Sequence, residues 1–469
     1  MQDNSRKTKI RTGVYSLFGT FLLMLCSVLN PINNYLTSLL LIVSSIILYF
    51  YIVIFTTNMN WMDIRPVFSL VWMFTIGLAS LRLTEYQEVW QVKTWILLGV
   101  SYGIFTIGSS YGIILGESLF HRIINQHGVR KWGVISFNEK ISGNRVFNVC
   151  IITTLMGLLF FVINITLKKE LPFFSDNLFA YSEFYTKFHV FSVASTVVSG
   201  LCYYAIKRCQ LVTWKRIVMY LCIIYLVFLF PILIVSRGVF MTAALSLTTA
   251  VFYLNKKRFW ILVCCILVLG SVYLYSSNLR NLPDERLNIL FEPAEISMPG
   301  EINALKSDET HTTSLVLSPK MAFLYGYLTV SHDNFNEAVQ NSKELSYGIR
   351  QFKPFNVILR LKLPEIEKTY LVREHLNTYN IIGDAYYDFH TPGVIISVSI
   401  WSLIFGALQA IYLNSKNPFV LLALGNAVSA VALSFFAPWM SNFVHWMHWG
   451  TSILLYLACS ISRQPLENS

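Results

Sequence analysis

Long apolar stretches recur along this chain, and they constrain its fold more than any other feature. Each is about 17–25 residues long, which is the length a helix needs to cross the hydrocarbon core of a bilayer. Only 13% of the residues are charged, against about 25% in soluble domains. We therefore predict an all-α polytopic membrane protein with about 12 transmembrane helices. The twelve stretches are 13–29, 35–56, 66–82, 94–116, 146–166, 190–206, 217–236, 238–254, 259–276, 392–414, 419–438 and 443–460.

The placement of lysine and arginine predicts the orientation. With the N terminus in the cytoplasm, the cytoplasmic segments carry 19 of the 36 Lys and Arg residues, and the short outer loops carry 6. The other 11 lie in one long loop, 277–391, and long loops cross a membrane largely regardless of charge. We expect both termini inside and this loop outside. The net charge of +11 is then mostly a topology signal, and we expect no nucleic-acid partner.

The chain divides into three parts on this interpretation. Residues 1–276 form a membrane bundle of nine spans, 277–391 form an extracytoplasmic loop, and 392–469 form three C-terminal spans. None of the eight cysteines falls in an outer loop, so no disulfide framework is expected. Within the loop, 319–340 is apolar and then amphipathic, which predicts one or two helices lying on the outer membrane surface.

Four arginines are candidates for binding an anion at the outer surface. Arg237 stands in Ser236-Arg237-Gly238, between two spans with no room for a loop. It either snorkels to the interface or presents its planar fork to phosphate oxygens. Arg350, Arg360 and Arg373 lie in 343–373, which is locally +4 within a loop that is −4 overall. That patch is either a solvated face or a site for a polyanion at the lipid surface.

The segment just before the tenth span gathers donors, acceptors and aromatic rings. If 374–390 is helical, Asp384 and Asp388 share one face and Tyr387 lies beside them. A carboxylate or imidazole there could take a proton from an attacking hydroxyl, and the rings could bind sugars. The alternative is an interfacial aromatic cap with solvated charges. The candidates are His375, Asn377, Tyr379, Asp384, Tyr387, Asp388 and His390.

Several function classes lack their signals. There is no Walker A glycine loop, and no Asp-x-Asp pair in an outer loop. No span is expected to bury an ionisable residue, which argues against an ion-coupled transporter. His445 and His448 could share a helical face and hold a metal, but Trp446 and Trp449 favour an interfacial aromatic belt.

These features resemble the Wzy-type oligosaccharide repeat-unit polymerases of bacteria, which make O-antigen and capsular polysaccharide. The resemblance covers most of the chain in architecture and implies a GT-C-like, O-antigen-ligase-like fold. In residues it is concentrated in Ser236-Arg237-Gly238, in 327–352 and in NTYNIIGDAYYDFHTPG at 377–393. The chain departs from the family where His390 replaces the common glycine after Asp-Phe, and where Leu376 separates His375 from Asn377.

The resemblance implies an enzyme that joins two undecaprenyl-pyrophosphate-linked glycans at the outer face of the bacterial cell membrane. It implies pyrophosphate binding by Arg237, Arg373, Arg350 and Arg360. Candidate bases are His375, Asp388 and Asp384, and candidate sugar-binding residues are Asn377, Tyr379, Tyr387 and His390. No metal or other cofactor is expected. The expected partners are the lipid-linked substrates, the bilayer, and the flippase and chain-length regulator of the same pathway.

Three other functions remain open. An O-antigen ligase would share the fold and donor but transfer the glycan to the lipid A core. A lipid-linked oligosaccharide flippase would also need many spans, although not the large outer loop. A non-catalytic assembly scaffold would not depend on the arginines.

Overall fold

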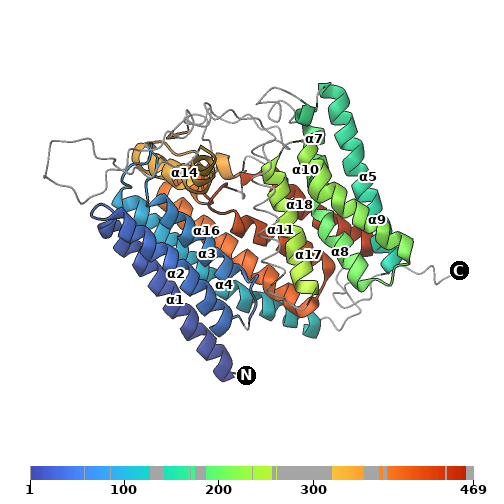
Figure 1. The fold of residues 1–469 in the computed structure, drawn as a ribbon. Helices are drawn as coiled ribbons and strands as arrows, with labels where there is room; N and C mark the ends of the chain where they lie inside the picture. The colour runs from blue at the N-terminus through green and yellow to red at the C-terminus, as the bar shows by residue number, and fades with distance from the viewer. Residues whose placement is uncertain are drawn as a thin grey trace.

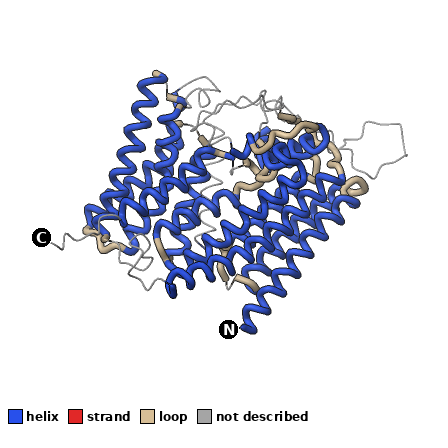
Figure 2. Tube along the Cα trace, turned by 180° about the vertical axis from the view of Figure 1, so that it is seen from behind, coloured by secondary structure: helices blue, strands red, loops and turns tan. Residues whose placement is uncertain are grey.

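The computed structural model shows an all-helical protein in the residues that it describes. These are 2–57, 59–84, 86–126, 142–169, 171–174, 186–234, 236–255, 260, 319–352, 369–372, 378–438 and 441–460. Figure 2 shows helices joined by short loops, with no strand in this part of the chain. The all-α prediction is confirmed for these residues.

The helices follow the apolar stretches closely. They are α1 Gln2–Leu29, α2 Asn34–Phe55, α3 Ile64–Ala79, α4 Val92–Gln126, α5 Gly143–Lys168, η1 Pro172–Phe174, α7 Lys187–Ala194, η2 Ser195–Val197, α8 Val198–Arg208, α9 Thr213–Ile224, η3 Tyr225–Leu229, α10 Phe230–Leu233, α11 Arg237–Leu254, α14 Pro319–Asn341, α16 Gly383–Ser415, α17 Pro418–Ala432 and α18 Phe443–Ser460. The predicted ninth span, 259–276, lies outside the described residues except for Trp260. Each of the other eleven predicted spans overlaps a helix or a continuous helical run.

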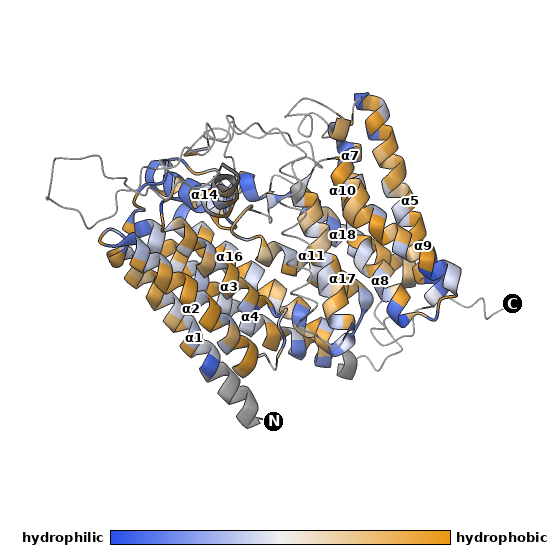
Figure 3. Ribbon diagram, viewed as in Figure 1, coloured by the Kyte–Doolittle hydropathy of each residue, from blue (hydrophilic) through white to orange (hydrophobic). Residues whose placement is uncertain are grey.

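Seven helical segments are long and apolar enough to cross a membrane, which makes this a membrane-embedded protein. They are Arg11–Leu29, Asn34–Phe55, Val92–Arg122, Gly143–Lys168, Lys187–Arg208, Thr213–Leu233 and Gly383–Ser415. Ile64–Ala79, Gly238–Leu254 and Pro418–Ala432 are apolar but shorter. Figure 3 shows hydrophobic residues along the outer faces of α1 and α2, where Leu17 and Ile47 are 69% and 59% exposed. Those faces suit contact with lipid.

Polar residues at the edges of the apolar stretches start the helices. Their side-chain oxygens accept hydrogen bonds from backbone N–H groups of the first turn, which no helical partner satisfies. This arrangement explains why helix starts coincide with short polar residues in the sequence. The capping residues are Asn33, Asp63, Thr186, Ser236 and Asn417.

The helices form two groups (Figure 1). One contains α1–α4, α14 and α16, and the other contains α5, α7–α11 and α18. Helix α17 joins them, since Leu421 and Leu424 pack into the first hydrophobic cluster, whereas Phe419 and Leu422 pack into the second. Helix α11 also contributes to both clusters, through Phe252 to the first and Phe240 to the second.

Within the first group, α4 and α16 approach one another most closely. Gly108, Gly112 and Gly116 recur every four residues along α4. A Cβ added at Gly112 would overlap the carbonyl of Leu403 in α16. Small residues at this spacing allow close contact between helix backbones in membranes. This contact holds α16 at a fixed height relative to α4.

The helix predicted within 319–340 exists as α14 Pro319–Asn341, and its place on the outer membrane surface stays a prediction. Eight consecutive residues, 329–336, are buried, so the middle of the helix is enclosed by other parts of the protein on every side, whereas Met321 near its start is exposed. It lies across the ends of α3 and α4 that are remote from the N terminus (Figure 1). The Tyr325 hydroxyl donates to the Leu78 carbonyl at 3.0 Å and accepts from the Leu83 N–H at 3.2 Å, which fixes α14 to the α3–α4 connection.

Candidate functional site

Helix α16 bends sharply after its first six residues, and the bend builds the candidate site. Phe389 and His390 leave helical geometry, and His390 has φ 50° and ψ −139°. Pro392 follows, and a proline inside a helix removes one hydrogen bond and clashes with the preceding turn. Gly393 lies so close to the first turns that a Cβ there would overlap the Ala385 carbonyl. The helical prediction for 374–390 is therefore confirmed only for 383–388 among the described residues.

The bend frees two carbonyls, which a loop then uses. The Tyr387 carbonyl accepts a hydrogen bond from the Ser346 N–H at 3.0 Å, and the Asp388 carbonyl accepts one from the Tyr347 N–H at 3.1 Å. Tyr347 and Gly348 both have positive φ, at 48° and 87°. That conformation turns the chain into a short helical turn at 349–352.

The Asp388 side chain, which belongs to α16, caps the short helical turn at 349–352. One carboxylate oxygen accepts the Arg350 N–H at 3.0 Å, and the other accepts the Gln351 N–H at 2.9 Å. The side chain is fully buried. The first N–H groups of a helical turn have no internal partner, and a carboxylate is well suited to satisfy them. Asp388 therefore fixes the backbone from which the Arg350 side chain projects.

The Arg350 guanidinium lies flat against an aromatic ring. Its Cζ atom is 3.8 Å from the centre of the Tyr387 ring, and Nη1 donates to the Thr369 hydroxyl at 3.2 Å. Stacking on a ring favours Arg over Lys, because the guanidinium is planar and weakly hydrated. Arg350 is only 9% exposed, so its charge lies in a largely desolvated setting.

Two tyrosines hold this arrangement through their hydroxyls. The Tyr387 hydroxyl accepts the Tyr370 N–H at 2.9 Å and lies 2.9 Å from the Tyr379 hydroxyl, which donates to the Tyr370 carbonyl. Burial and the neighbouring Tyr387 hydroxyl raise the pKa of Tyr379, so it stays protonated at neutral pH. Tyr379 is 4% exposed and Tyr387 is fully buried. In this structure both rings support Arg350 and neither offers an open face to a sugar.

The remaining described candidates lie around the same short helix. Asp384 is half-buried in the first turn of α16, one turn from Asp388. His390 is half-buried at the bend, with its ring centre 5.0 Å from that of Tyr386. Of the two aspartates, Asp384 is the more accessible to solvent.

One residue near the site was missed by the sequence analysis. Lys93, in the first turn of α4, donates from Nζ to the Tyr386 hydroxyl at 2.8 Å and lies 5.2 Å from the centre of that ring. It brings a second cation to the short helix that carries Asp384 and Tyr387. In the sequence Lys93 is one of the six Lys and Arg residues of the short outer loops, and it was used only to predict the orientation.

Five of the predicted site residues cannot be placed by their side chains. His375, Asn377, Arg360 and Arg373 lie outside the described residues. Arg237 begins α11, where Ser236 is the capping residue, but its side chain also lies outside the described part. The opposite end of α11 is fixed by Tyr253, whose hydroxyl accepts from the Asn60 amide at 3.1 Å near the start of α3. The start of α11 therefore lies at the end of the bundle that bears α14 (Figure 1).

Helix α14 supports the site through buried polar side chains. The Asn334 amide donates to the Thr378 carbonyl at 2.7 Å, and its oxygen accepts the Val372 N–H at 2.9 Å. His332 lies between the Thr75 hydroxyl, 2.9 Å from Nε2, and the Asn380 amide, 3.3 Å from Nδ1. Burial lowers the pKa of His332 to about 3, so the ring is neutral. The run Ser331-His332-Asp333-Asn334 thus fixes neighbouring segments to α3 and to each other.

Asp333 is the acidic member of this buried group. Its two oxygens accept hydrogen bonds from the Gln87 amide at 2.9 Å and from the Trp90 indole at 2.8 Å. Burial raises its pKa to about 7 against the pull of these two donors. The side chain is 3% exposed, so it serves to attach α14 to the α3–α4 connection.

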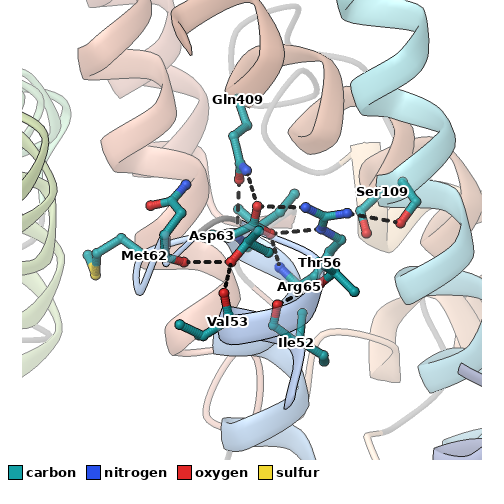
Figure 4. Close-up of polar contacts among 12 residues, drawn as sticks. Ile52, Val53, Thr56, Met62, Asp63, Arg65, Ser109 and Gln409 are labelled. Atoms are coloured by element: carbon teal, nitrogen blue, oxygen red, sulfur yellow. Dashed lines mark hydrogen bonds and ion pairs between the residues drawn. The ribbon is translucent and has the colours of Figure 1, made fainter. Parts of the chain in front are cut away.

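A second buried charge cluster lies at the opposite end of α16 (Figure 4). Asp63 caps α3 and pairs with Arg65, with Oδ2 to Nη2 at 2.8 Å and Oδ1 to Nε at 2.9 Å. Gln409 of α16 donates to Asp63 and accepts the Ile64 N–H at 3.1 Å. Removing one partner from a buried pair costs about 3–5 kcal/mol. The saturated contacts indicate a structural link between α3 and α16.

The expectation that no span buries an ionisable residue is wrong at α18. His445 and His448 are 2% and 1% exposed, and His448 Nε2 lies 3.2 Å from the Val193 carbonyl and 3.3 Å from the Thr196 hydroxyl. The interfacial aromatic belt stays a prediction: Trp446 and Trp449 are half-buried and pack on Trp401 of α16 at ring-centre distances of 5.5 and 5.3 Å. Residues 445–449 therefore form contacts between helices. Because two histidines are buried here, the absence of buried ionisable residues no longer argues against an ion-coupled transporter.

Within the described part of the chain, no group of three or more His, Cys, Asp or Glu side chains could hold a metal ion. The buried candidates instead pair with backbone N–H groups, amides and aromatic rings. What the site offers chemically is a stacked guanidinium, a second cation and a partly accessible carboxylate at one end of a membrane bundle.

Comparison with known proteins gives no relative. No protein-family model, no curated protein and no solved structure matches this chain. Its function must therefore be inferred from its own residues.

Proposed function

We propose that this chain polymerises undecaprenyl-pyrophosphate-linked oligosaccharide repeat units at the outer face of the bacterial cell membrane. The product would be O-antigen or capsular polysaccharide. This proposal takes up the twelve-span, GT-C-like architecture and the resemblance to Wzy-type polymerases described above. The single observation that supports it most is the Arg350 guanidinium, held on Tyr387 beside the bend that opens α16.

The position of Arg350 suits a lipid diphosphate. A polyprenol tail keeps such a substrate in the bilayer, while its diphosphate and sugars lie just outside. Arg350 stacks on Tyr387 at the start of the long apolar helix α16, and Lys93 at the start of α4 contacts the neighbouring Tyr386. An arginine fork can hold phosphate oxygens through two parallel hydrogen bonds, and its charge acts strongly where water is excluded.

The reaction forms one bond and breaks one. A hydroxyl oxygen on the terminal sugar of one glycan attacks the anomeric carbon of the other. The bond from that carbon to the diphosphate oxygen breaks, and the electron pair leaves with undecaprenyl pyrophosphate. The proton of the attacking hydroxyl passes to a base, for which Asp384 is the accessible candidate among the described carboxylates and His375 is a further candidate. Guanidinium groups stabilise the negative charge that develops on the leaving group.

The proposal is tested with purified protein and a defined lipid-linked repeat unit, with the products resolved by size on a gel. A ladder of polymers is expected. Arg350→Lys should lower the rate about 10- to 100-fold, because the ammonium keeps the charge but loses the planar stack and the fork. Arg122→Gln, an exposed change at the opposite end of α4, is the control for loss of a positive charge and should polymerise normally.

Metal independence is tested in the same assay. Polymerisation should continue in EDTA, and a strict requirement for added divalent cation would overturn a mechanism based on arginines alone. Retained full activity in Arg350→Ala would remove Arg350 from the site.

The rival functions predict different products in cells. A strain lacking a polymerase should carry surface polysaccharide of single repeat units. Loss of all attached polysaccharide would instead indicate a ligase, and repeat units trapped on the inner leaflet would indicate a flippase. The buried His445 and His448 keep the flippase under consideration.

A further inference from the structure

Basic side chains gather at one corner of the bundle, far from the candidate site. They come from the start of α5, the end of α8 and the start of α9. Lys207, Arg208 and Arg216 are exposed, whereas Arg145 and Lys215 are half-buried. Helices α5, α8 and α9 contain no Asp or Glu. The positive charge of the corner is therefore not neutralised by acidic residues of these three helices. Figure 3 shows hydrophilic residues at these ends of α8 and α9.

Packing holds the three helix ends together. Lys215 Nζ donates to the Asn144 side-chain oxygen of α5 at 2.7 Å and lies 5.1 Å from the ring centre of Phe147. Trp214 packs edge-on against Phe147 at 5.5 Å between ring centres. Cys209, just after α8, approaches Gly143 so closely that a Cβ there would lie 2.9 Å from the Cys209 Cβ. The cations thus form one surface with a fixed geometry.

Apolar side chains continue from this surface along the outside of α9. Trp214 is 57% exposed, and Ile217 and Leu221 follow on the same helix at 55% and 59% exposed. Tryptophan is typical of the membrane–water interface, and the aliphatic residues beyond it suit acyl chains. A molecule that fits the whole surface carries phosphate at one end and hydrocarbon at the other.

We propose that this corner binds the headgroup of an anionic phospholipid of the inner leaflet, with its acyl chains along α9. A headgroup with two phosphates, as in cardiolipin, fits five cations better than a headgroup with one. The placement of lysine and arginine assigns this end of the bundle to the cytoplasm, where anionic lipids attract basic residues. Positive residues that only set the orientation of a membrane protein can lie anywhere in its cytoplasmic loops. Here the positive residues of three helix ends are packed into one surface. The inference is independent of the proposed polymerase activity.

Native mass spectrometry of the purified protein tests the proposal, using tetraoleoyl cardiolipin, dioleoyl phosphatidylglycerol and dioleoyl phosphatidylcholine as probes. Cardiolipin should bind most tightly and phosphatidylcholine least. Arg216→Gln should weaken cardiolipin binding about fivefold, and Lys215→Gln together with Arg216→Gln about 25-fold, since each basic residue near a membrane surface contributes about 1 kcal/mol. Arg122→Gln, an exposed charge at the end of α4, is the matched control and should bind as the original chain does.

The other outcomes overturn the proposal. Equal affinity for the three lipids would exclude an anionic headgroup site. Equal weakening by Arg122→Gln would show a response to total charge and no site at this corner. Displacement of cardiolipin by millimolar inorganic phosphate would identify a free anion as the ligand. Thermal unfolding in phosphatidylcholine should be the same for Arg216→Gln and the original chain, so the test does not depend on the double variant folding.

Discussion

Asp388 and Asp384 are one helical turn apart, yet their surroundings give them different roles. Both oxygens of Asp388 accept backbone N–H groups, from Arg350 and Gln351, whereas Asp384 is half-buried in the first turn of α16. A carboxylate that is occupied by two backbone donors is poorly placed to accept a proton from a substrate. We therefore assign Asp388 to positioning and keep Asp384 as a candidate base.

Replacing each aspartate by asparagine separates the two roles. Asp388→Asn puts an NH₂ group against a buried backbone N–H, so it should lower the free energy of unfolding by about 1–3 kcal/mol and reduce polymerisation as well. Asp384→Asn should leave unfolding unchanged and abolish polymerisation if Asp384 is the base. Thermal unfolding and the gel assay measure the two effects. An Asp388→Asn protein that unfolds normally but is inactive would make Asp388 the base.

Asp333 gives the stability of the protein a specific pH dependence. Its pKa is raised from 3.8 to about 7 by burial, so between about pH 4 and 7 the folded chain keeps a proton that the unfolded chain has lost. Stability from this group is therefore present below pH 4 and is lost as pH rises toward 7. Asp333→Asn should remove the loss. Gln87, Trp90 and Glu337, which influence this carboxyl group, are the same in both proteins.

The measurement is thermal unfolding of the two proteins from pH 5 to pH 8. The unfolding temperature of Asp333→Asn relative to the original chain should rise across this range. His332, whose pKa is lowered to about 3, acts in the opposite direction below about pH 6.5, but it is present in both proteins and cancels in the difference. A constant difference across the range would mean that Asp333 is ionised throughout.

At the residue scale the sequence could predict the spacing of the two aspartates but not what each one does. The one-turn spacing of Asp384 and Asp388 follows from helical periodicity. The capping role of Asp388 does not, because it depends on a turn at 349–352 and a bend at 389–390 that bring distant segments together. Lys93 was missed for the same reason, since its contact with Tyr386 joins residues far apart in the sequence.

At the scale of elements, the contact between α4 and α16 depends on glycine. Gly112→Ala would place a Cβ against the Leu403 carbonyl, which belongs to the backbone and cannot rotate away. We expect the free energy of unfolding to fall by about 1–3 kcal/mol, with a lower thermal unfolding temperature. Gly13→Ala is the matched control, because nothing lies within 4 Å of a Cβ at that position of α1. It should leave stability unchanged or raise it by up to about 1 kcal/mol; equal effects of the two changes would mean that α4 and α16 are not in tight contact.

The apolar stretches predicted the helices well because the bilayer fixes both their length and their composition. The amphipathic pattern of 319–340 also predicted a helix, α14, but it did not predict how deeply the middle of this helix is buried. Ser331, His332 and Asn334 are polar but buried, and their hydrogen-bond partners lie on α3 and in segments far along the chain, which no local pattern reveals. The bend in α16 was signalled by Pro392 and Gly393, although its angle depends on tertiary contacts.

At the scale of the whole molecule, the proposed function requires that α14 and the bend of α16 face outside and that the basic corner faces the cytoplasm. The structure separates these two ends (Figure 1), while the 19-to-6 distribution of Lys and Arg predicts which end is outside.

Single cysteine substitutions test this orientation. Lys343 and Arg216 are both exposed, at opposite ends. We expect Lys343→Cys to react with a membrane-impermeant maleimide in intact spheroplasts, and Arg216→Cys to react only after the membrane is opened. Of the native cysteines in the described part of the chain, only Cys209 is not fully buried, so Cys209→Ser is the background for both variants. The reverse pattern would place Arg350 in the cytoplasm, away from any glycan displayed outside, and would overturn the polymerase proposal even if purified protein still bound anionic lipid at the corner.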